Sequence, residues 1–320
     1  MASRNHDPAM DKRLQRKAKA ELHEEHVEAH LESFRRTVQS MKHIRFPCET
    51  DSLMPFLRQA KFVQSAAVAR LDNFSTLRLS ETQGIPKWFT YPPMEDPVVS
   101  HYLRDGVMFE LGRTDEDVLM LLFRMPAWHL KYIGRKSIMR MVFMDLDRII
   151  LDPATQIAGC GIIFDMSGAT HQKLVTGSTA NDLKMEVKII QDGYPLRLKH
   201  VVFYNEPSIL DTLYKMLEGW ISDKMRKRFI RVHKHISRAF EAIPGLERIM
   251  PPEYGGRGES VDVLIDRHQK AFEEFYSGPY PWDRIELHES LRPDSAKHYM
   301  RHYHPAVVNL GNSSRVDYDQ

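Results

Sequence analysis

The pattern that most constrains the fold is an alternation of short apolar runs and helical stretches between residues 107 and 204. Apolar runs of strand length cover residues 107–111, 118–123, 159–164 and 198–204. Between them, residues 134–151 and 180–191 carry the apolar spacing of helices. Because consecutive parallel strands need a crossover connection, this order predicts an α/β domain with a mainly parallel sheet.

The flanking regions suggest how the chain divides. Residues 10–40 are dense in charge and predict a solvated, partly frayed helix, whereas residues 53–60 and 65–77 carry apolar helical stripes. Four prolines make residues 84–97 the best candidate linker. A last helix is expected from Ser260 to about Tyr276, followed by an irregular tail from residue 278. The expected units are a charged extension at 1–34, a helical module at 35–95, the α/β domain at 96–257, and a helix with a tail at 258–320.

Composition narrows the class of protein. The 42% hydrophobic and 28% charged residues are typical of a soluble globular chain. The first residues lack the apolar core of a secretory signal, and no stretch offers the roughly 20 apolar residues of a membrane span. Of the two cysteines, Cys48 and Cys160, the second lies in an apolar run and is expected to be a buried thiol. A reducing, cytosolic location is therefore expected.

Signatures of catalysis and of cofactor or metal binding are absent from the sequence. Gly159 and Gly161 lack the third glycine of a nucleotide-binding loop, and no serine-hydrolase elbow occurs. His26 and His30 have metal-ligand spacing, but in so charged a helix they are better interpreted as a solvated face. Asp165 ends a core strand without a base or nucleophile partner, which favours a structural hydrogen bond. We therefore predict no catalytic residue, no metal and no cofactor, and an enzyme is the least supported class.

Charge is unevenly distributed along the chain. Residues 195–240 contain ten bases and four acids, a net charge of +6, which leaves −4 for the remainder. Arg197 and Lys199 are two apart at a strand entry, and Lys224 and Arg228 are four apart on a short helix, so each pair shares a side. Two such pairs suit a phosphate monoester, although a solvated basic face remains the alternative. Nucleic acid is not predicted, because no stacking aromatics accompany the bases.

An amphipathic helix lies between the two pairs of bases, at residues 207–221. Its broad apolar face consists of Ile209, Leu210, Leu213, Met216, Leu217, Trp220 and Ile221. An apolar helix flanked by bases is what contact with an anionic membrane surface requires. The alternative is that this helix covers a soluble core.

Three ordered motifs in this region resemble a known family. They are residues 161–168 (GIIFDMSG), residues 202–207 (VFYNEP) and residues 252–256 (PEYGG), and residues 53–62 (LMPFLRQAKF) look like the helical module that precedes them. The set resembles the CRAL-TRIO (Sec14-like) lipid-binding family, especially its alpha-tocopherol transfer protein and cellular retinaldehyde-binding protein group. The resemblance implies a cytosolic carrier that holds one hydrophobic molecule in an apolar cavity behind a mobile gate helix and delivers it at membranes.

The resemblance also assigns roles to residues. Arg197, Lys199, Lys224 and Arg228, which we call the basic cluster, would bind a phosphoinositide headgroup. The gate would present Ile209, Leu210, Leu213, Leu217, Trp220 and Ile221. The lipid pocket would be lined by Met139, Val142, Leu146, Cys160, Ile162, Phe164, Ile190, Tyr194, Val201 and Phe203, for each of which ordinary core packing is the alternative.

Two further points concern function. This chain has Glu218-Gly219-Trp220-Ile221 where the family usually has Lys-Pro-Phe-Leu at the end of the gate. The expected function is transfer of a tocopherol-, retinoid- or terpenoid-like lipid at phosphoinositide-containing membranes, with transient membrane association. The alternative is a lipid-sensing adaptor that regulates a protein partner through its termini.

Overall fold

The computed structural model describes residues 8–79, 87–174 and 180–294. Its core is a five-stranded sheet with the order β2-β3-β4-β5-β6. Strands β3 to β6 run parallel, and β2 pairs with β3 in the antiparallel direction. The predicted α/β fold with a mainly parallel sheet is thereby confirmed. The strands are β2 (Met108–Arg113), β3 (Leu119–Arg124), β4 (Cys160–Asp165), β5 (Leu198–Tyr204) and β6 (Phe229–His233).

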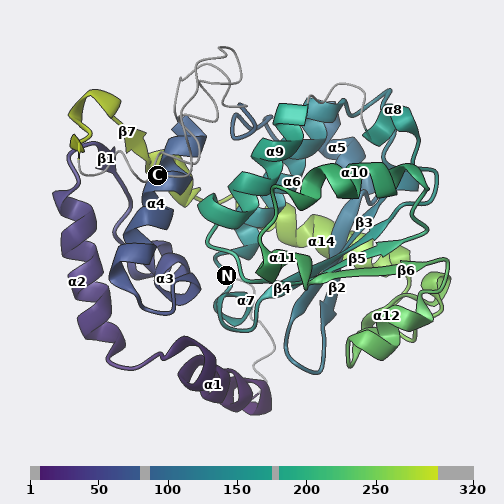
Figure 1. Ribbon diagram of the computed structural model, residues 1–320, viewed down its shortest axis with the longest axis horizontal. Coiled ribbons are helices and arrows are strands. Elements are labelled where there is room, and N and C mark those ends of the chain that lie inside the picture. The colour runs from purple at the N-terminus through teal and green to yellow at the C-terminus, as the bar shows by residue number, and fades with distance from the viewer. Residues whose placement is uncertain (1–7, 80–86, 175–179, 295–320) are drawn as a thin grey trace.

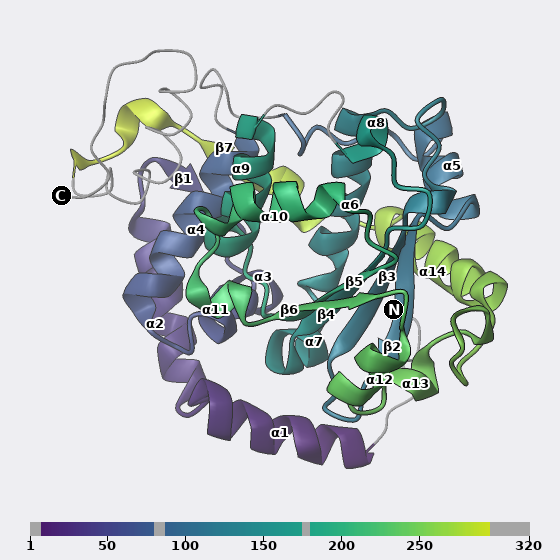
Figure 2. The same cartoon turned by 45° about the vertical axis from the view of Figure 1, so that its right-hand side comes forward.

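The two faces of the sheet pack against different helices, because successive side chains of a strand point to opposite sides. One face, with Met120, Ile163 and Val202, is covered by the segments α12 (Ser237–Ala242), α13 (Leu246–Ile249) and α14 (Val261–Tyr276). The opposite face belongs to the larger core of the molecule. Figures 1 and 2 show that side beneath the helices α6 (Arg135–Ile149), α9 (Ala180–Lys188) and α10 (Ile209–Glu218).

Shorter elements complete the domain. The π-turn η2 (Ile189–Gly193) continues α9, so the helix predicted at residues 180–191 ends in a wider turn. The described part of the predicted linker, from residue 87, is packed rather than loose, since Trp88 is buried against Phe143. The remaining elements are α5 (Pro97–Arg104), η1 (Met125–Ala127), α7 (Pro153–Ala158), α8 (His171–Leu174), α11 (Asp223–Arg226) and η3 (Pro252–Tyr254).

The N-terminal region differs from the single solvated helix that its charge predicts. Two helices, α1 (Pro8–Leu22) and α2 (Val27–Ser40), each bury one apolar side. In α1 the buried residues are Leu14, Ala18 and Leu22, spaced four apart, which is one helix face. Figures 1 and 2 show α1 apart from the other N-terminal helices, α2, α3 (Thr50–Gln59) and α4 (Gln64–Leu79), and running toward the lower edge of the sheet.

The C-terminal segment is more ordered than expected up to the end of the described residues. Strand β7 (Glu286–Leu287) pairs with β1 (Ile44–Arg45), and the turns η4 (Pro281–Arg284) and η5 (Glu289–Leu291) flank it. Trp282 is buried against the rings of Phe46 and Phe74, at 5.9 and 5.1 Å between centroids. The described segment from Pro281 to Arg292 therefore packs on the N-terminal helical module. Of the terminal regions through which a protein partner was expected to dock, residues 1–7 and 295–320 lie outside the described residues.

Candidate functional site

One apolar sheet face carries the strand residues of the predicted pocket. The register pairs Ile162 with Val201 and Phe164 with Phe203, so these four side chains share a side. Cys160 lies two residues before Ile162, on the same side. The rings of Phe164 and Phe203 stack at 5.6 Å between centroids. Ile162, Phe164 and Phe203 are only half-buried, so other side chains cover this apolar face incompletely.

The helical residues of the predicted pocket pack against the same core. Leu146 is buried, whereas Met139 and Val142, on the preceding turns of α6, are half-buried, as is Ile190. Tyr194 is buried, and its hydroxyl donates to Asp147 at 2.6 Å and accepts from Arg78 at 3.1 Å. The hydroxyl and the ring of Tyr194 therefore both have partners within the protein, since the ring packs against those of Phe74 and Phe143, each at 5.5 Å between centroids.

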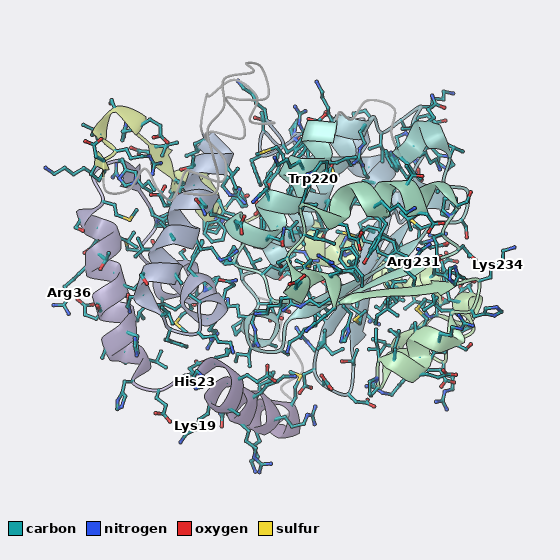
Figure 3. All side chains as sticks on the ribbon, viewed as in Figure 1. Lys19, His23, Arg36, Trp220, Arg231 and Lys234 are labelled. Atoms are coloured by element: carbon teal, nitrogen blue, oxygen red, sulfur yellow. The ribbon has the colours of Figure 1, made fainter. Side chains whose placement is uncertain are left out.

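Helix α10 lies across this region. Tyr214 packs against Phe229, the neighbour of Val201 in the sheet, at 5.9 Å between ring centroids. Leu210 and Ile221 are buried, and Trp220, labelled in Figure 3, is half-buried just after the helix. The side chains of Ile209, Leu213 and Leu217 lie outside the described part of the structure. The helix predicted to be a gate is thus placed at the sheet, where it covers apolar side chains.

Polar contacts hold both ends of α10. Arg231 of β6 donates to Asp211, in the first turn of α10, at 2.7 Å and to Glu206 at 3.3 Å. Although burial alone lowers the pKa of Arg231, its bonds to these carboxylates raise it. After the helix, the Gln191 side chain donates to the Trp220 carbonyl at 3.0 Å and accepts from the Ser222 amide at 2.9 Å. Sequence reasoning missed both contacts, because nothing in their spacing links residues 20 or more positions apart.

The basic cluster assembles next to these elements. Arg197 and Lys199 are half-buried, Arg228 is half-buried and Lys224 is exposed. Burial lowers the pKa of Lys224, and the neighbouring charges of Arg228, Lys61, Arg197 and Lys199 lower it further. Burial and the charge of Arg197 also lower the pKa of Arg228. The structure thus brings the four predicted bases within electrostatic reach of one another and adds Lys61, which sequence reasoning did not assign.

Two contacts fix the position of Arg197, the first base of the basic cluster. Arg197 donates to the Ile157 carbonyl. Gly159 has a φ of 92°, and a Cβ there would lie 2.4 Å from the Arg197 carbonyl oxygen. Only glycine permits this close approach without strain. The backbone before β4 therefore positions the first base of the cluster.

The acidic partner of the cluster comes from α1. Glu21 accepts from Arg197 at 2.8 Å and from Lys199 at 3.1 Å. Burial alone would raise the pKa of Glu21, but the hydrogen bonds from Arg197 and Lys199 lower it. No sequence signal marks this contact, which joins residues 176 and 178 positions apart.

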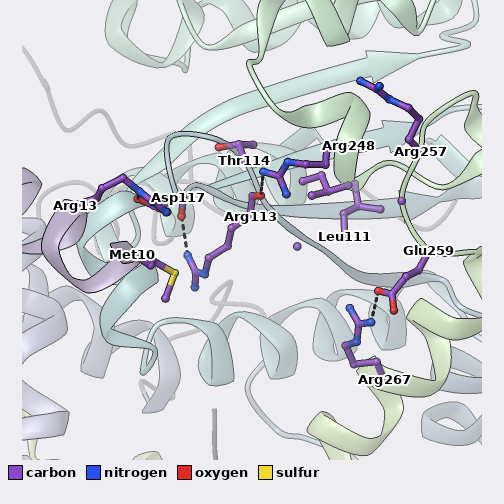
Figure 4. A pocket seen from close by; sticks show the side chains of 13 residues that line it. Met10, Arg13, Leu111, Arg113, Thr114, Asp117, Arg248, Arg257, Glu259 and Arg267 are labelled. Atoms are coloured by element: carbon purple, nitrogen blue, oxygen red, sulfur yellow. Dashed lines mark hydrogen bonds and ion pairs between the residues drawn. The ribbon is translucent and has the colours of Figure 1, made fainter. Parts of the chain in front are cut away.

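Two polar cavities lie elsewhere on the domain. Figure 4 shows the larger, of about 610 Å³, between α1, β2 and the α13–α14 region. Its arginines are paired, for example Arg13 with Asp117 at 2.8 Å and Arg248 with Asp115 at 2.9 Å. Each arginine of this lining thus has an acidic partner, either in the lining or beside it.

The second cavity, of about 500 Å³, lies at the carboxyl ends of β4 and β5. There Asp165 accepts from the Tyr254 hydroxyl at 2.8 Å and from the Ser167 amide at 3.0 Å. Burial, followed by the charge of Asp165, raises the pKa of Tyr254. Asp165 thus has the structural hydrogen bonds that its sequence position favours.

The histidines considered as metal ligands do not share a helix face. His26 precedes α2 with a φ of 51°, so it stands outside the helix. His30 lies within α2 and packs edge-on against Phe62, at 5.4 Å between ring centroids. Their sequence spacing therefore does not translate into a ligand pair.

The chain is similar to a known domain family, to curated relatives and to a solved structure. The CRAL/TRIO domain family matches residues 103–256. Clavesin-2 from Homo sapiens is 25% identical over 302 residues, which is 91% of this chain and 90% of the relative. Alpha-tocopherol transfer protein-like from Mus musculus is 25% identical over 230 residues, 70% of this chain and 64% of the relative. The crystal structure of Sfh5 aligns with 82% of this chain and 92% of its own at a TM-score of 0.41 and 12% identity.

The family match spans β2 to β6, and hence the apolar sheet face, α10 and the basic cluster. Among the described residues, no helix combines the length and apolar character needed to cross a membrane. Residues 103–256 of this chain are a CRAL/TRIO domain, the domain of a family of lipid-binding and lipid-transfer proteins.

Proposed function

We propose that this protein binds one hydrophobic molecule beneath α10 and transfers it at membranes that contain phosphoinositides. The observation that carries the proposal is the position of a half-buried apolar sheet face under a helix whose ends are tied by polar contacts, next to the basic cluster. Taken singly, the apolar face and α10 could be ordinary core packing, and the basic cluster could be a solvated basic face. Together they supply a lipid site, a cover and a membrane contact.

The apolar site would hold its ligand through the hydrophobic effect. Each 100 Å² of apolar surface removed from water contributes roughly 2.5 kcal/mol. The ring stack of Phe164 and Phe203 offers flat apolar surface, and the Tyr194 hydroxyl is already bonded to Asp147. These features favour a ligand with an extended apolar body, such as a tocopherol-, retinoid- or terpenoid-like lipid, over one recognised by many hydrogen bonds.

The basic cluster would bind the phosphate groups of a phosphoinositide. Lys224 is exposed, and four other bases contribute to its electrostatic environment. Like charges placed together raise the potential energy of the free protein, and an anion relieves that repulsion. Lys224 and Arg228 follow α10 directly in the chain. Binding of a headgroup there would pull on the end of the gate that Gln191 holds.

Two experiments test this proposal. Lipid extracted from the purified protein and identified by mass spectrometry should include one apolar species at a stoichiometry near one. Recovery of the protein without any bound lipid, together with failure to take up a fluorescent retinoid or tocopherol, would contradict the carrier function.

For the membrane contact, Lys224→Glu should reduce flotation with phosphatidylcholine vesicles that contain a phosphatidylinositol phosphate, and adding Arg228→Glu should reduce it further. Lys234→Glu with Arg238→Glu is the matched control, because both residues are exposed and lie outside the basic cluster. Equal loss in both pairs would indicate general electrostatic attraction, and no loss in either would reject the headgroup site.

A further inference from the structure

The carboxylate of Glu21, near the end of α1, occupies one half of the basic cluster. Its Oε2 atom accepts from Arg197 Nη2 at 2.8 Å and from Lys199 Nζ at 3.1 Å. A phosphate oxygen would form the same charge-assisted bonds with these two bases. Glu21 and any anion that uses both Arg197 and Lys199 therefore exclude each other, and the presence of Glu21 lowers the affinity of all such anions by the same factor.

Helix α1 brings this carboxylate to the bases from outside the residues that match the CRAL/TRIO family. The helix buries an apolar face that consists of Leu14, Ala18 and Leu22. Arg13 pairs with Asp117 at 2.8 Å, and Lys17 donates to the Glu116 carbonyl at 2.8 Å. Because Glu21 is attached to a docked helix, it competes with an external anion at a high effective concentration.

Helix α1 can leave the domain without disturbing the rest of the N-terminal region. Figures 1 and 2 show it apart from the other N-terminal helices. The Arg13 side chain is 51% exposed, and the Lys17 bond also lies at the surface, where such contacts add little stability. A helix of 15 residues is marginally stable on its own, so an undocked α1 would fray. Loss of the Glu21 bonds should therefore shift α1 measurably toward the undocked state.

The other half of the basic cluster gives an external anion an advantage over Glu21. Lys224 is exposed, and Arg228 lies beside it in the chain and in space. Burial and the charges of the neighbouring bases lower the pKa of Lys224, which places it in a strongly positive environment. A ligand with several phosphate oxygens can contact these bases as well as Arg197 and Lys199. That additional attraction allows it to displace the tethered carboxylate.

We infer that α1 is an autoinhibitory element of the basic cluster: docking of α1 through Glu21 and binding of an anion at Arg197 and Lys199 oppose each other. Because such coupling is reciprocal, an anion on these bases weakens the docking of α1 by the factor by which docked α1 weakens the anion. This inference rests on the anion site of the proposed function and adds its regulation. The ligand chemistry is a phosphate group, carried by a lipid headgroup or by a soluble inositol phosphate.

Anion affinity is the first quantity to measure, in the wild type and in Glu21→Gln, which keeps the size of the side chain and removes its charge. Glu25→Gln is the matched control, because it changes the net charge equally and Glu25 is exposed, 3.6 Å from Lys19. Calorimetry with soluble inositol bisphosphate reports on a free ligand. Flotation with phosphatidylcholine vesicles that carry a phosphatidylinositol bisphosphate reports on a lipid headgroup.

Glu21→Gln is expected to bind about threefold to tenfold more tightly, by a similar factor in both assays, because the charge that competes for the bases is gone. Glu25→Gln should match the wild type. Equal gains in the two variants would indicate general electrostatics and overturn the inference. Unchanged or weaker binding in Glu21→Gln would also overturn it, while leaving the headgroup site of the proposed function intact. Absence of binding by every variant in both assays would overturn the inference and the proposed headgroup site together.

Docking of α1 is the second quantity, followed by hydrogen exchange of the amides of residues 12–22. Saturating inositol bisphosphate, or the vesicles, should speed this exchange about threefold to tenfold in the wild type. In Glu21→Gln the exchange should already be fast without ligand and respond little to it. Exchange that is unchanged or slower with ligand in the wild type would overturn the inference, since α1 would then tolerate or cover the anion.

Exchange in β3 and β4 distinguishes release of α1 from partial unfolding. It should be the same in the wild type and in Glu21→Gln. Glu21→Ala, which removes the charge without introducing an amide, should reproduce both the tighter binding and the faster exchange of α1. If β3 and β4 exchange faster together with α1 in both variants, the effect is general destabilisation and the inference is overturned.

Discussion

Arg292 donates from one guanidinium nitrogen to both carboxylate oxygens of Asp72, at 2.6 and 2.7 Å, across 220 positions of the chain. Both side chains are buried, with exposed fractions of 3% and 0%. His43 lies 3.0 Å from the same carboxylate. The C-terminal segment thus neutralises a charge at the centre of the N-terminal helical module.

Replacing Arg292 should therefore destabilise the module. Arg292→Met leaves Asp72 buried without its main partner, and breaking a buried pair costs about 3–5 kcal/mol. Chemical denaturation monitored by circular dichroism measures the loss. The control is Arg284→Met, because Arg284 and its partner Glu49 are each 56% exposed, and such pairs contribute about 1 kcal/mol or less. Equal effects of the two changes would contradict the buried-pair interpretation.

A cluster of tyrosines around Asp147 should make the protein sensitive to alkaline pH. The hydroxyls of Tyr91, Tyr194 and Tyr280 all donate to this buried carboxylate. Burial, and then the negative charge of Asp147, raise the pKa of each tyrosine well above its ordinary value. In the unfolded chain they ionise near pH 10, at about their reference pKa, so the folded state holds more protons above that pH. Stability should therefore be complete below about pH 10 and decline as the pH rises further.

Tyrosinate absorbance and circular dichroism, followed together against pH, check this expectation. The buried tyrosines should ionise only as the fold is lost. Full ionisation of all 12 tyrosines with an unchanged dichroism spectrum would contradict it.

Cys160 should be inert in the folded protein. Burial raises the pKa of its thiol to about 12, so little thiolate is present at neutral pH. In a Cys48→Ser background, an Ellman-type reagent should react with Cys160 only slowly until denaturant is added. A native reaction as fast as the denatured one would contradict the buried position of the β4 start.

The Arg231 contact should control how readily α10 opens. Arg231→Gln removes the charge that joins Asp211 and Glu206, and Glu206 has a side chain only 1% exposed. If α10 is a gate, exchange of a bound fluorescent lipid should become several-fold faster, with little change in lipid affinity. Arg248→Gln, which breaks an exposed pair on the other side of the domain, is the control. An unchanged exchange rate would argue against a gating role for this contact.

Most of the sheet could be predicted from sequence because its strands carry their own signal. The run at residues 198–204 coincides with β5, and the other three runs lie within one or two residues of β2, β3 and β4. Strand β6 was missed because Arg231 and His233 interrupt its apolar pattern. Arg231 instead forms an ion pair with Asp211 of α10. Local pattern cannot reveal a charge whose partner is remote in sequence.

In the candidate site, too, some residues could be found from the sequence and others only from the structure. Spacing and the family motifs singled out the four bases of the basic cluster, although Arg197 lies just before β5 and Arg228 lies after the end of α11, so neither pair sits on a single strand or helix as predicted. Glu21 comes from α1 and Lys61 from the turn between α3 and α4, and only the folded structure brings them near the other bases. The apolar face of α1 was overlooked because Leu14, Ala18 and Leu22 are spaced four apart among many charges.

The pairing of β1 with β7 has a consequence for how the protein is made. Arg45 and Glu286 are 241 positions apart, so the helical module lacks its partner strand until the residues between them have been synthesised. At about 5–20 residues per second, the interval is on the order of ten to fifty seconds. A nascent chain that stops early leaves the aromatic core around Phe46 and Phe74 uncovered, a surface that chaperones and proteases recognise. This aromatic core is thus closed only after the segment that carries Trp282 and β7 has been synthesised.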